Sequence, residues 1–257
     1  DYFRFKAKAG EWLYMSTLLG QSGPADTLLT LYDENGNEQL AQGHGRNYKP
    51  GSLWKLGDIM HRFEKAGSYC LKVEDESDPP AGSAEHRYEV LVTPAAKWGL
   101  IVEVEPNDTI AAPQVLVAGS MKFGVDFGAD FADANDVDVL AWTAPFGVEA
   151  LSVHLHPAGE TGWGGTHSAG LIRVLASDGM TVLAETDATR GASALWIPVT
   201  AQSKYFVETS FPKGQPAGSN DSYVLTFQTI ETGTGVEKDD LANGNANGAQ
   251  AVSFTSD

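Results

Sequence analysis

The chain has 257 residues, of which 34 are acidic and 17 basic, and its net charge of -17 gives a sequence pI near 4.6. This acidity argues against a nucleic-acid ligand, because phosphate binding needs basic surface. The 42% hydrophobic and 10% aromatic content is typical of a globular protein. No apolar run approaches the roughly 20 residues that a membrane-spanning helix requires.

The first residues read as a strand already under way, with Asp1-Tyr2-Phe3-Arg4-Phe5, so we expect a mature or truncated form rather than a native start. Asn35-Gly36 and Asp178-Gly179 each lie between apolar runs and predict tight hairpins, since both turn residues tolerate positive φ. Further on, apolar and polar residues alternate from Tyr69 to Val73 and again from Tyr88 to Val92. This period of two predicts half-buried strands.

The second half of the chain repeats the first at an offset of about 136 residues. The parallel segments keep their order: Asp1–Phe5 with Asp138–Trp142, Leu29–Gly36 with Ile172–Gly179, Tyr69–Val73 with Tyr205–Thr209, Pro80–Ser83 with Pro216–Ser219, and Arg87–Val92 with Ser222–Phe227. An offset of this length indicates a domain-sized duplication rather than a solenoid. Helix is expected only as a turn or two, near Thr109–Ala112.

The predicted fold class is therefore all-β, with two tandem, jelly-roll-like β-sandwich domains. The first domain spans residues 1–96 and lacks its N-terminal segment, and the second, complete domain spans residues 101–230. Residues 231–257 form a linker or tail. Because Glu237-Lys238-Asp239-Asp240 is similar to Glu105-Pro106-Asn107-Asp108, the tail is the start of a third copy, a strand donated to the first domain in cis or in trans, or a disordered linker.

Acidic residues gather at the opening of the second domain. Glu103 and Glu105 are two residues apart and share one face of an extended strand, and Asn107 and Asp108 follow the turn at Pro106. A second group of oxygen donors comes some thirty residues later, with Asp133, Asn135, Asp136 and Asp138. Calcium binds six to eight such oxygens, so we predict a Ca²⁺ site. The alternative is that Asn107-Asp108-Thr109 caps a short helix and the aspartates solvate a loop.

These motifs resemble the bacterial pre-peptidase C-terminal domain family. The resemblance rests on Glu103-x-Glu105-Pro106-Asn107-Asp108-Thr109, Asp136-x-Asp138, a last strand with Tyr223, and Asp26-Thr27-Leu28-Leu29 in the first copy. It covers residues 1–230 as two copies. It implies a non-catalytic, jelly-roll-like β-sandwich attached to exported proteins. Some members, such as the collagen-binding domains of clostridial collagenases, bind calcium through the Glu-x-Glu-Pro-Asn segment and a downstream aspartate loop.

Other sites are less well supported by the sequence. None of the six histidines has a zinc-binding spacing. His154 and His156 share one face of a predicted strand, which indicates either a two-ligand transition-metal site or two solvent-exposed side chains. No residue pattern singles out a catalytic pair, so we expect no enzyme. Trp163 and Trp54 lie in glycine-containing loops and are candidate ligand-binding residues. Trp12, Trp142 and Trp196 lie in apolar strands and are expected in the core.

The expected function is that of a calcium-stabilised accessory binding or adhesion module of an exported bacterial protein, secreted or at the cell surface. Its partner would be an extracellular protein fibre, a glycan or the parent's own catalytic domain. The alternative is a structural spacer, or an export and processing module without a ligand of its own.

Overall fold

The computed structural model describes residues 1–19, 27–43, 57–75, 88–117, 125–131, 135–156, 170–186, 193–211 and 221–231. Most of these residues are in strands, which confirms the predicted all-β class. Within them the one helix is a 3-10 turn, η1 (Ala95–Trp98). The helical turn expected near Thr109–Ala112 is a hydrogen-bonded turn instead, because Pro113 disfavours helical geometry at the preceding residue.

Seventeen strands are described. Those before η1 are β1 (Tyr2–Ala7), β2 (Glu11–Leu19), β3 (Thr27–Tyr32), β4 (Gln39–Gly43), β5 (Asp58–Phe63), β6 (Gly67–Asp75) and β7 (Tyr88–Pro94). Those after it are β8 (Ile101–Val102), β9 (Gln114–Val115), β10 (Val125–Phe131), β11 (Val137–Thr143), β12 (Val148–His156), β13 (Leu171–Leu175), β14 (Val182–Glu185), β15 (Ser193–Pro198), β16 (Lys204–Ser210) and β17 (Asp221–Glu231). No helix among the described residues is long and apolar enough to span a membrane.

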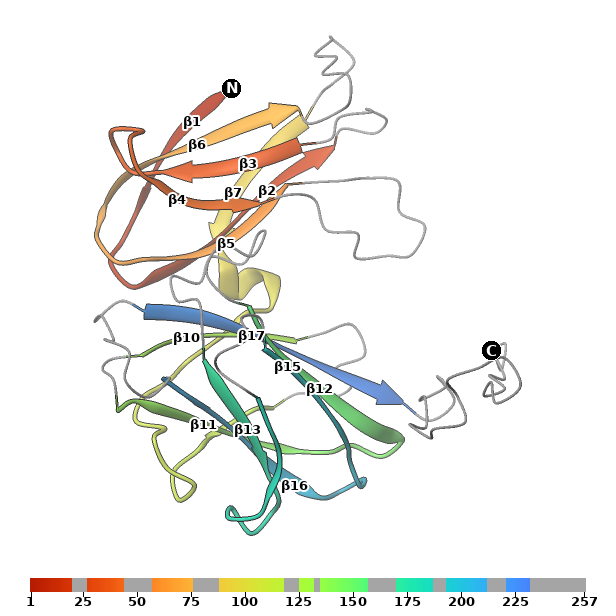
Figure 1. The fold of residues 1–257 in the computed structure, drawn as a ribbon. Helices are drawn as coiled ribbons and strands as arrows, with labels where there is room; N and C mark the ends of the chain where they lie inside the picture. The colour runs from red at the N-terminus through yellow and green to blue at the C-terminus, as the bar shows by residue number, and fades with distance from the viewer. Residues whose placement is uncertain are drawn as a thin grey trace, which may run out of the picture.

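The strands before η1 form one β-sandwich. Its sheets have the orders β1-β6-β3-β4 and β5-β2-β7. Side chains that alternate along these strands point between the sheets and make a core of fully buried residues, among them Met15, Leu29, Leu31, Ile59 and Phe63. This first sandwich is the upper body in Figure 1.

The strands after η1 form a second, larger sandwich, the lower body in Figure 1. Its sheets have the orders β15-β12-β17-β10-β8 and β14-β13-β16-β11-β9. The core between them contains Phe127, Leu140, Trp142, Val153 and Phe227.

The two sandwiches match strand for strand. The order β1-β6-β3-β4 corresponds to β11-β16-β13-β14, and β5-β2-β7 corresponds to β15-β12-β17. Register agrees as well, since Phe3 lies opposite Leu71 where Leu140 lies opposite Val207. Both β3–β4 and β13–β14 carry a register shift, at Leu31/Tyr32 and at Val174/Leu175. Among the described strands, β8, β9 and β10 have no counterpart in the first sandwich.

The corresponding hairpins also use the same turn chemistry. Gly36 and Gly179 have φ of 70° and 68°, a left-handed conformation that glycine adopts without steric cost. An aspartate anchors each turn, but from a different position: Asp33 Oδ1 accepts from the backbone N–H of Asn37, and Asp178 Oδ1, directly before the glycine, accepts from that of Met180. The two dipeptides were predicted as hairpin turns from sequence.

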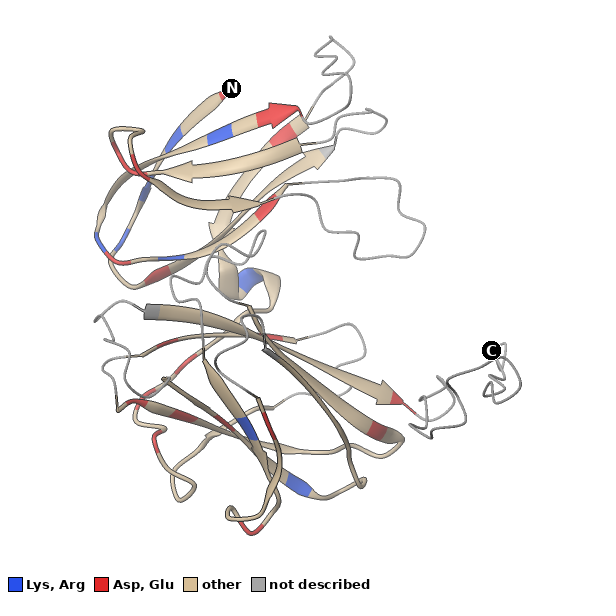
Figure 2. Ribbon diagram, in the orientation of Figure 1, with Lys and Arg blue, Asp and Glu red and all other residues tan. Residues whose placement is uncertain are grey.

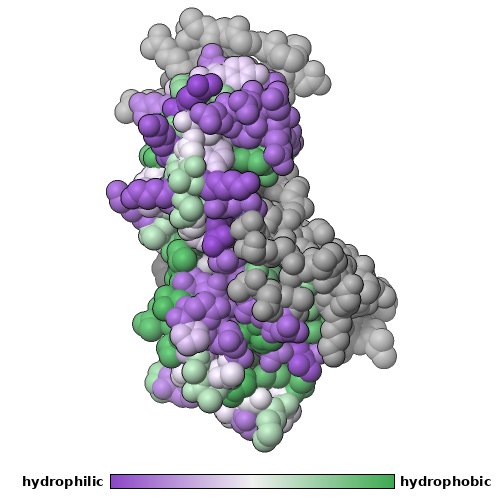
Figure 3. Space-filling model, turned by 90° about the vertical axis from the view of Figure 1, so that its left-hand side faces the viewer, coloured by the Kyte–Doolittle hydropathy of each residue, from purple (hydrophilic) through white to green (hydrophobic). Residues whose placement is uncertain are grey.

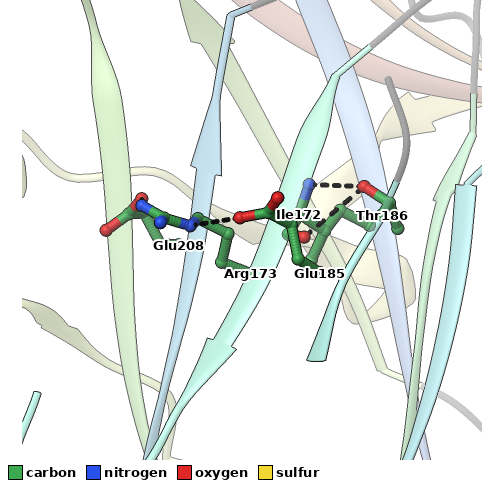
Figure 4. A network of polar contacts seen from close by, with 5 residues as sticks. All are labelled: Ile172, Arg173, Glu185, Thr186 and Glu208. Atoms are coloured by element: carbon green, nitrogen blue, oxygen red, sulfur yellow. Dashed lines mark hydrogen bonds and ion pairs between the residues drawn. The ribbon is translucent and has the colours of Figure 1, made fainter. Parts of the chain in front are cut away.

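Equivalent positions on the outer sheet faces carry different polar contacts. In the second sandwich, Arg173 of β13 bridges two strands, with its Nε 2.7 Å from Glu185 Oε2 and its Nη1 3.1 Å from Glu208 Oε1 (Figure 4). In the first sandwich, the corresponding Thr30 accepts a hydrogen bond from Gln42 Nε2 at 3.3 Å.

A small apolar cluster joins the two sandwiches. Trp12 and Met60 of the first pack with Leu100 and Val224 of the second, and η1 lies beside them (Figure 1). Gly128 leaves room for this contact, since a Cβ there would lie 3.1 Å from the ring of Trp12. An ion pair adds to the junction, with Arg62 Nη2 3.0 Å from Asp130 Oδ2.

Candidate metal centre

The segment from residue 101 to 116 holds the acidic motif over one end of the second core. Its strand β8 pairs in parallel with β10 in one sheet, and its strand β9 pairs in parallel with β11 in the other. Between them, the carbonyl of Asn107 accepts a hydrogen bond from the backbone N–H of Val139 at 3.2 Å. The loop between β8 and β9 is therefore tied to both sheets at the open end of the sandwich.

This arrangement brings five carboxylates together. Oxygens of Glu103, Glu105 and Asp138 lie within 4.8 Å of one another, and so do oxygens of Glu105, Asp108 and Asp136. Glu105 belongs to both groups and links them. Asp138 is only 1% exposed, because it shares the inward face of β11 with Leu140 and Trp142.

Hydrogen bonds orient the side chains around the cluster. Asn107 Nδ2 donates to Glu103 Oε1 at 3.0 Å, and the Asn107 backbone N–H donates to Glu105 Oε2 at 2.7 Å. The Tyr223 hydroxyl donates to Asp138 Oδ2 at 2.5 Å. Among the described residues, two buried oxygens of this cluster accept no hydrogen bond: Asn107 Oδ1 and Asp138 Oδ1.

Burial and mutual repulsion make this cluster costly without a cation. Burial, together with the neighbouring Glu103 carboxylate, raises the pKa of Asp138 well above its usual range. Burial also raises the pKa of Glu105, and the charges of Glu103, Asp108 and Asp136 add to this effect. Such a set of hard oxygen donors favours a divalent cation that replaces the missing hydrogen bonds.

The predicted ligands divide into three groups. Glu103, Glu105, Asp108, Asp136 and Asp138 come together, with Asn107 fully buried among them. Asn135 is exposed, and its predicted role as a ligand stays a prediction. Asp133 lies outside the described residues, as do the candidate binding residues Trp54 and Trp163 and the tail after residue 231.

Two contributors to this end of the sandwich were not predicted as site residues, although Tyr223 was named in the resemblance. Tyr223 supplies the donor to Asp138, and Asp130 donates its backbone N–H to Glu103 Oε2 at 3.1 Å. Asp130 also holds Arg62 of the first sandwich, so it connects the acidic cluster to the junction. The alternation of Phe127, Ala129 and Phe131 with Gly128 and Asp130 could have placed Asp130 on the outward face.

Other predicted features fall elsewhere. His154 and His156 lie side by side on β12, with ring centroids 4.2 Å apart, and His156 Nε2 lies 2.7 Å from Thr226 Oγ1. They are not part of either group of potential metal ligands. Trp142 and Trp12 are buried, but the expectation for Trp196 was wrong: it is 45% exposed, because its neighbours Leu195 and Ile197 take the inward face of β15.

No protein-family model matches the chain, and neither does any curated protein. Among solved structures, the pre-peptidase C-terminal domain of a collagenase from Bacillus anthracis is 8% identical with a TM-score of 0.31, over 50% of this chain and 100% of that domain. The periplasmic g-type lysozyme inhibitor PliG of Aeromonas hydrophila is 9% identical with a TM-score of 0.32, over 51% of this chain and 97% of the inhibitor.

Tandem CBM51 modules of a family 98 glycoside hydrolase from Streptococcus pneumoniae are 11% identical with a TM-score of 0.28, over 89% of this chain and 81% of theirs. Similarities at these values identify no family, so the proposals below rest on the chain's own residues.

Proposed function

We propose that this chain is a non-catalytic accessory binding module of an exported bacterial protein, and that a calcium ion stabilises its second sandwich. The observation that carries the calcium site is the pair of buried oxygens, Asn107 Oδ1 and Asp138 Oδ1, that accept no hydrogen bond from any described residue and lie beside crowded carboxylates. Buried polar atoms are rarely left unsatisfied. A cation at this position would bind both oxygens and neutralise the charge.

The donor set favours calcium over other metals. Glu103, Glu105, Asn107, Asp136 and Asp138 offer only carboxylate and amide oxygens, and Asp108 lies within reach of the same group. Hard oxygen ligands in this number suit Ca²⁺, whereas zinc and copper prefer imidazole and thiolate. The ion would supply charge neutralisation and cross-linking of the loop to β11, and no chemical step.

The duplicated architecture supports the pre-peptidase C-terminal type. The two sandwiches share strand order, register and a tyrosine–aspartate hydrogen bond, made by Tyr223 and Asp138 in one and by Tyr88 and Asp1 in the other. We infer tandem copies with boundaries near 1–96 and 101–230, the first without the strands that carry the acidic loop.

Calcium would also fix how the two sandwiches are oriented. Glu103 accepts a hydrogen bond from the backbone of Asp130, and the Asp130 carboxylate pairs with Arg62 across the junction. An ion that immobilises Glu103 therefore holds the strand that presents Asp130 to the first sandwich. The module would then offer its sheet faces and loops in one fixed arrangement.

The test is thermal and chemical unfolding in EDTA and then in millimolar calcium, with calorimetric titration of the metal. Calcium at a hundred times its dissociation constant should stabilise the protein by about 2.7 kcal/mol. Asp138→Asn should abolish this response and yet stabilise the metal-free protein, because the neutral amide avoids the cost of burying or protonating a carboxylate while keeping an acceptor for Tyr223. A variant that lost the calcium response because it misfolded would not be more stable than the unmodified chain in EDTA.

Glu149→Gln is the matched control, since Glu149 is exposed on β12 and belongs to neither group of potential ligands. It should keep the full calcium response. The site would be refuted if calcium stabilised the Asp138→Asn and Glu105→Gln variants as much as the unmodified chain. It would also be refuted if calcium did not stabilise the unmodified chain.

The partner we propose is an extracellular protein fibre, a glycan or the parent's catalytic domain, with Trp54 and Trp163 as candidate contact residues. Saturable binding to collagen or to a polysaccharide array, weakened by Trp163→Ala, would support it. Absence of binding to fibres, glycans and the parent enzyme would favour the spacer or export-module alternative.

A further inference from the structure

The outer face of strands β15, β12 and β17 in the second sandwich carries an exposed tryptophan beside polar side chains. Trp196 is 45% exposed and lies opposite Ser152, which in turn lies opposite the exposed Gln228. Their side chains form one row across three neighbouring strands. The next row along the same face contains His154 and Thr226, which also lie opposite each other. We call the side chains of these two rows the Trp196 face.

The equivalent face of the first sandwich is covered. Met60 lies opposite Tyr14 as Trp196 lies opposite Ser152. Met60 is 4% exposed and belongs to the cluster that joins the two sandwiches, and the ring of Tyr14 packs against that of Trp98 at a centroid distance of 4.9 Å. The same surface of the fold is thus an apolar contact in the first copy and an exposed, polar one in the second.

The Trp196 face continues directly from the junction between the sandwiches. Val224 of β17 is fully buried in the junction cluster and lies opposite Gly128, whose missing side chain leaves room for Trp12. Two residues further along β17, Thr226 is half-buried, and Gln228 beyond it is exposed. The junction therefore bounds the Trp196 face at one end, and a ligand on this face would lie next to an established contact surface.

Hydrogen bonds hold polar side chains of this face in place. The Thr226 hydroxyl donates to Asp126 Oδ1 at 2.7 Å, and His156 Nε2 lies 2.7 Å from the same Thr226 Oγ1. A hydroxyl has one hydrogen, so His156 Nε2 is the donor in the second contact. The ring of His154 packs beside that of His156, with the centroids 4.2 Å apart. Side chains that are fixed before binding lose less entropy when a ligand docks.

The Trp196 face is nearly neutral, although the chain carries a net charge of -17. Strands β12, β15 and β17 contain no lysine or arginine, and their acidic residues lie at or next to strand ends: Glu149, Asp221 and Glu231. Figure 2 shows these strands in tan between their ends. The carboxylate beside the face, that of Asp126, accepts the hydrogen bond from Thr226. A neutral surface on an acidic protein matches an uncharged ligand better than a polyanion, which the protein would repel.

Exposed large hydrophobic side chains are concentrated on the second sandwich in the part of the chain that the structure describes. Before η1 they are Tyr2 and Phe3, and after it they include two aromatic residues, Phe146 and Trp196. Figure 3 shows the same trend on one side of the molecule, where hydrophilic residues predominate over the upper sandwich and hydrophobic patches appear over the lower one. Phe146 lies in the turn between β11 and β12, whereas Trp196 stands on a sheet face.

An aromatic ring among hydrogen-bonding groups matches the chemistry of a sugar. The C–H face of a hexose ring packs on an aromatic side chain, while its hydroxyls both donate and accept hydrogen bonds. Hydroxyl and amide side chains such as Ser152 and Gln228 can do the same. The neighbours of Trp196 on its own face, Ala194 and Ser152, are small, which keeps the indole accessible.

We propose that the Trp196 face binds a neutral glycan, with a hexose ring on Trp196 and its hydroxyls bonded to Ser152, Gln228 and His154. The inference rests on the proposed binding function, for which it names the ligand class. It assigns the ligand to a sheet face rather than to the loops of Trp54 and Trp163.

The experiment is affinity electrophoresis of the whole chain through gels that contain a soluble polysaccharide, at a constant millimolar calcium concentration. The neutral probes are hydroxyethylcellulose, galactomannan and dextran, and the anionic probe is polygalacturonate. At least one neutral polymer should retard the chain saturably, and polygalacturonate should bind at least tenfold more weakly.

Substitutions then connect binding to the face. Trp196→Ala should weaken binding of the retarding polymer at least tenfold, and Gln228→Ala about threefold. Phe146→Ala is the matched control, because it removes an aromatic side chain that is 81% exposed on the same sandwich but away from this face. It should bind as the unmodified chain does. Urea unfolding of all three variants should remain close to that of the unmodified chain, since the three side chains are exposed.

The outcomes separate this site from the broader binding function. Binding that Trp196→Ala leaves unchanged and Trp163→Ala abolishes would overturn the Trp196 face as the site and keep the chain as a binding module. Failure of every neutral polymer to bind, or equal binding of polygalacturonate, would overturn the neutral glycan as the ligand. Collagen binding and the calcium response would still decide the proposed function on their own.

Discussion

The two sandwiches share strand order and register but differ at the ends of their cores. In the second, the segment that contains β8 and β9 covers the tyrosine–aspartate pair, and Asp138 and Tyr223 are each 1% exposed. In the first, the corresponding Asp1 and Tyr88 form the same hydrogen bond at a partly exposed surface. The same pair is thus a surface contact in one copy and a buried, charge-rich centre in the other, and the difference lies in the covering segment.

The largest effect is expected from core substitutions in β1 and β11. Leu140 is 1% exposed, whereas the equivalent Phe3 is 38% exposed on an edge strand. Leu140→Ala should destabilise its sandwich by about 2–5 kcal/mol, as expected for a filled core, and Phe3→Ala should cost less than half as much. Hydrogen exchange of peptides from β11 and β1 measures each effect locally. Equal losses would mean that the covering segment does not determine burial.

A second test uses His61, which is buried on the inward face of β5 at the position that Ile197 occupies in the second sandwich. The folded-state pKa of His61, about 4, lies below the unfolded value of 6.5, so the unfolded chain binds the proton first. Stability present at pH 7 is therefore lost as the pH falls through 6.5, and reaches a loss of about 3 kcal/mol near pH 4.

Comparison with His61→Leu isolates this loss from the carboxylates, which titrate in both proteins. The free energy of unfolding in urea, measured from pH 7 to 4, gives the difference. Parallel pH profiles of the two proteins would show that His61 is not neutral and buried.

The smallest effect expected is at the tyrosines. Tyr223→Phe removes the donor to Asp138 Oδ2 inside the second sandwich and should cost about 1–3 kcal/mol in EDTA. Tyr88→Phe, at the partly exposed equivalent position, should cost under about 1 kcal/mol because water replaces the hydroxyl. Urea unfolding of both variants provides the measurement, and a cost at Tyr88 that matches Tyr223 would contradict the role of burial.

Much of the fold follows from local patterns in the sequence. Alternation gave the strands around Tyr69–Val73 and Tyr88–Val92, and Asn35-Gly36 and Asp178-Gly179 form the expected turns. These features are predictable because side-chain direction and positive φ depend on nearby residues.

The candidate site was only partly predictable. Glu103, Glu105, Asn107 and Asp138 were found from their motif, but whether they meet depends on the pairing of β8 and β9 with two different sheets. Asp130 and Tyr223 join them through long-range register that no local pattern encodes.

The strand order also has a kinetic consequence. Two of the strand pairings join distant residues: Tyr2 pairs with Lys72, and Val125 pairs with Phe227. Such topologies close long loops before contacts repay the lost entropy, so β-sandwiches fold in about milliseconds to seconds. Unpaired strands are exposed during that interval, and each sandwich is then open to pairing with its own duplicate, whose strands share its register.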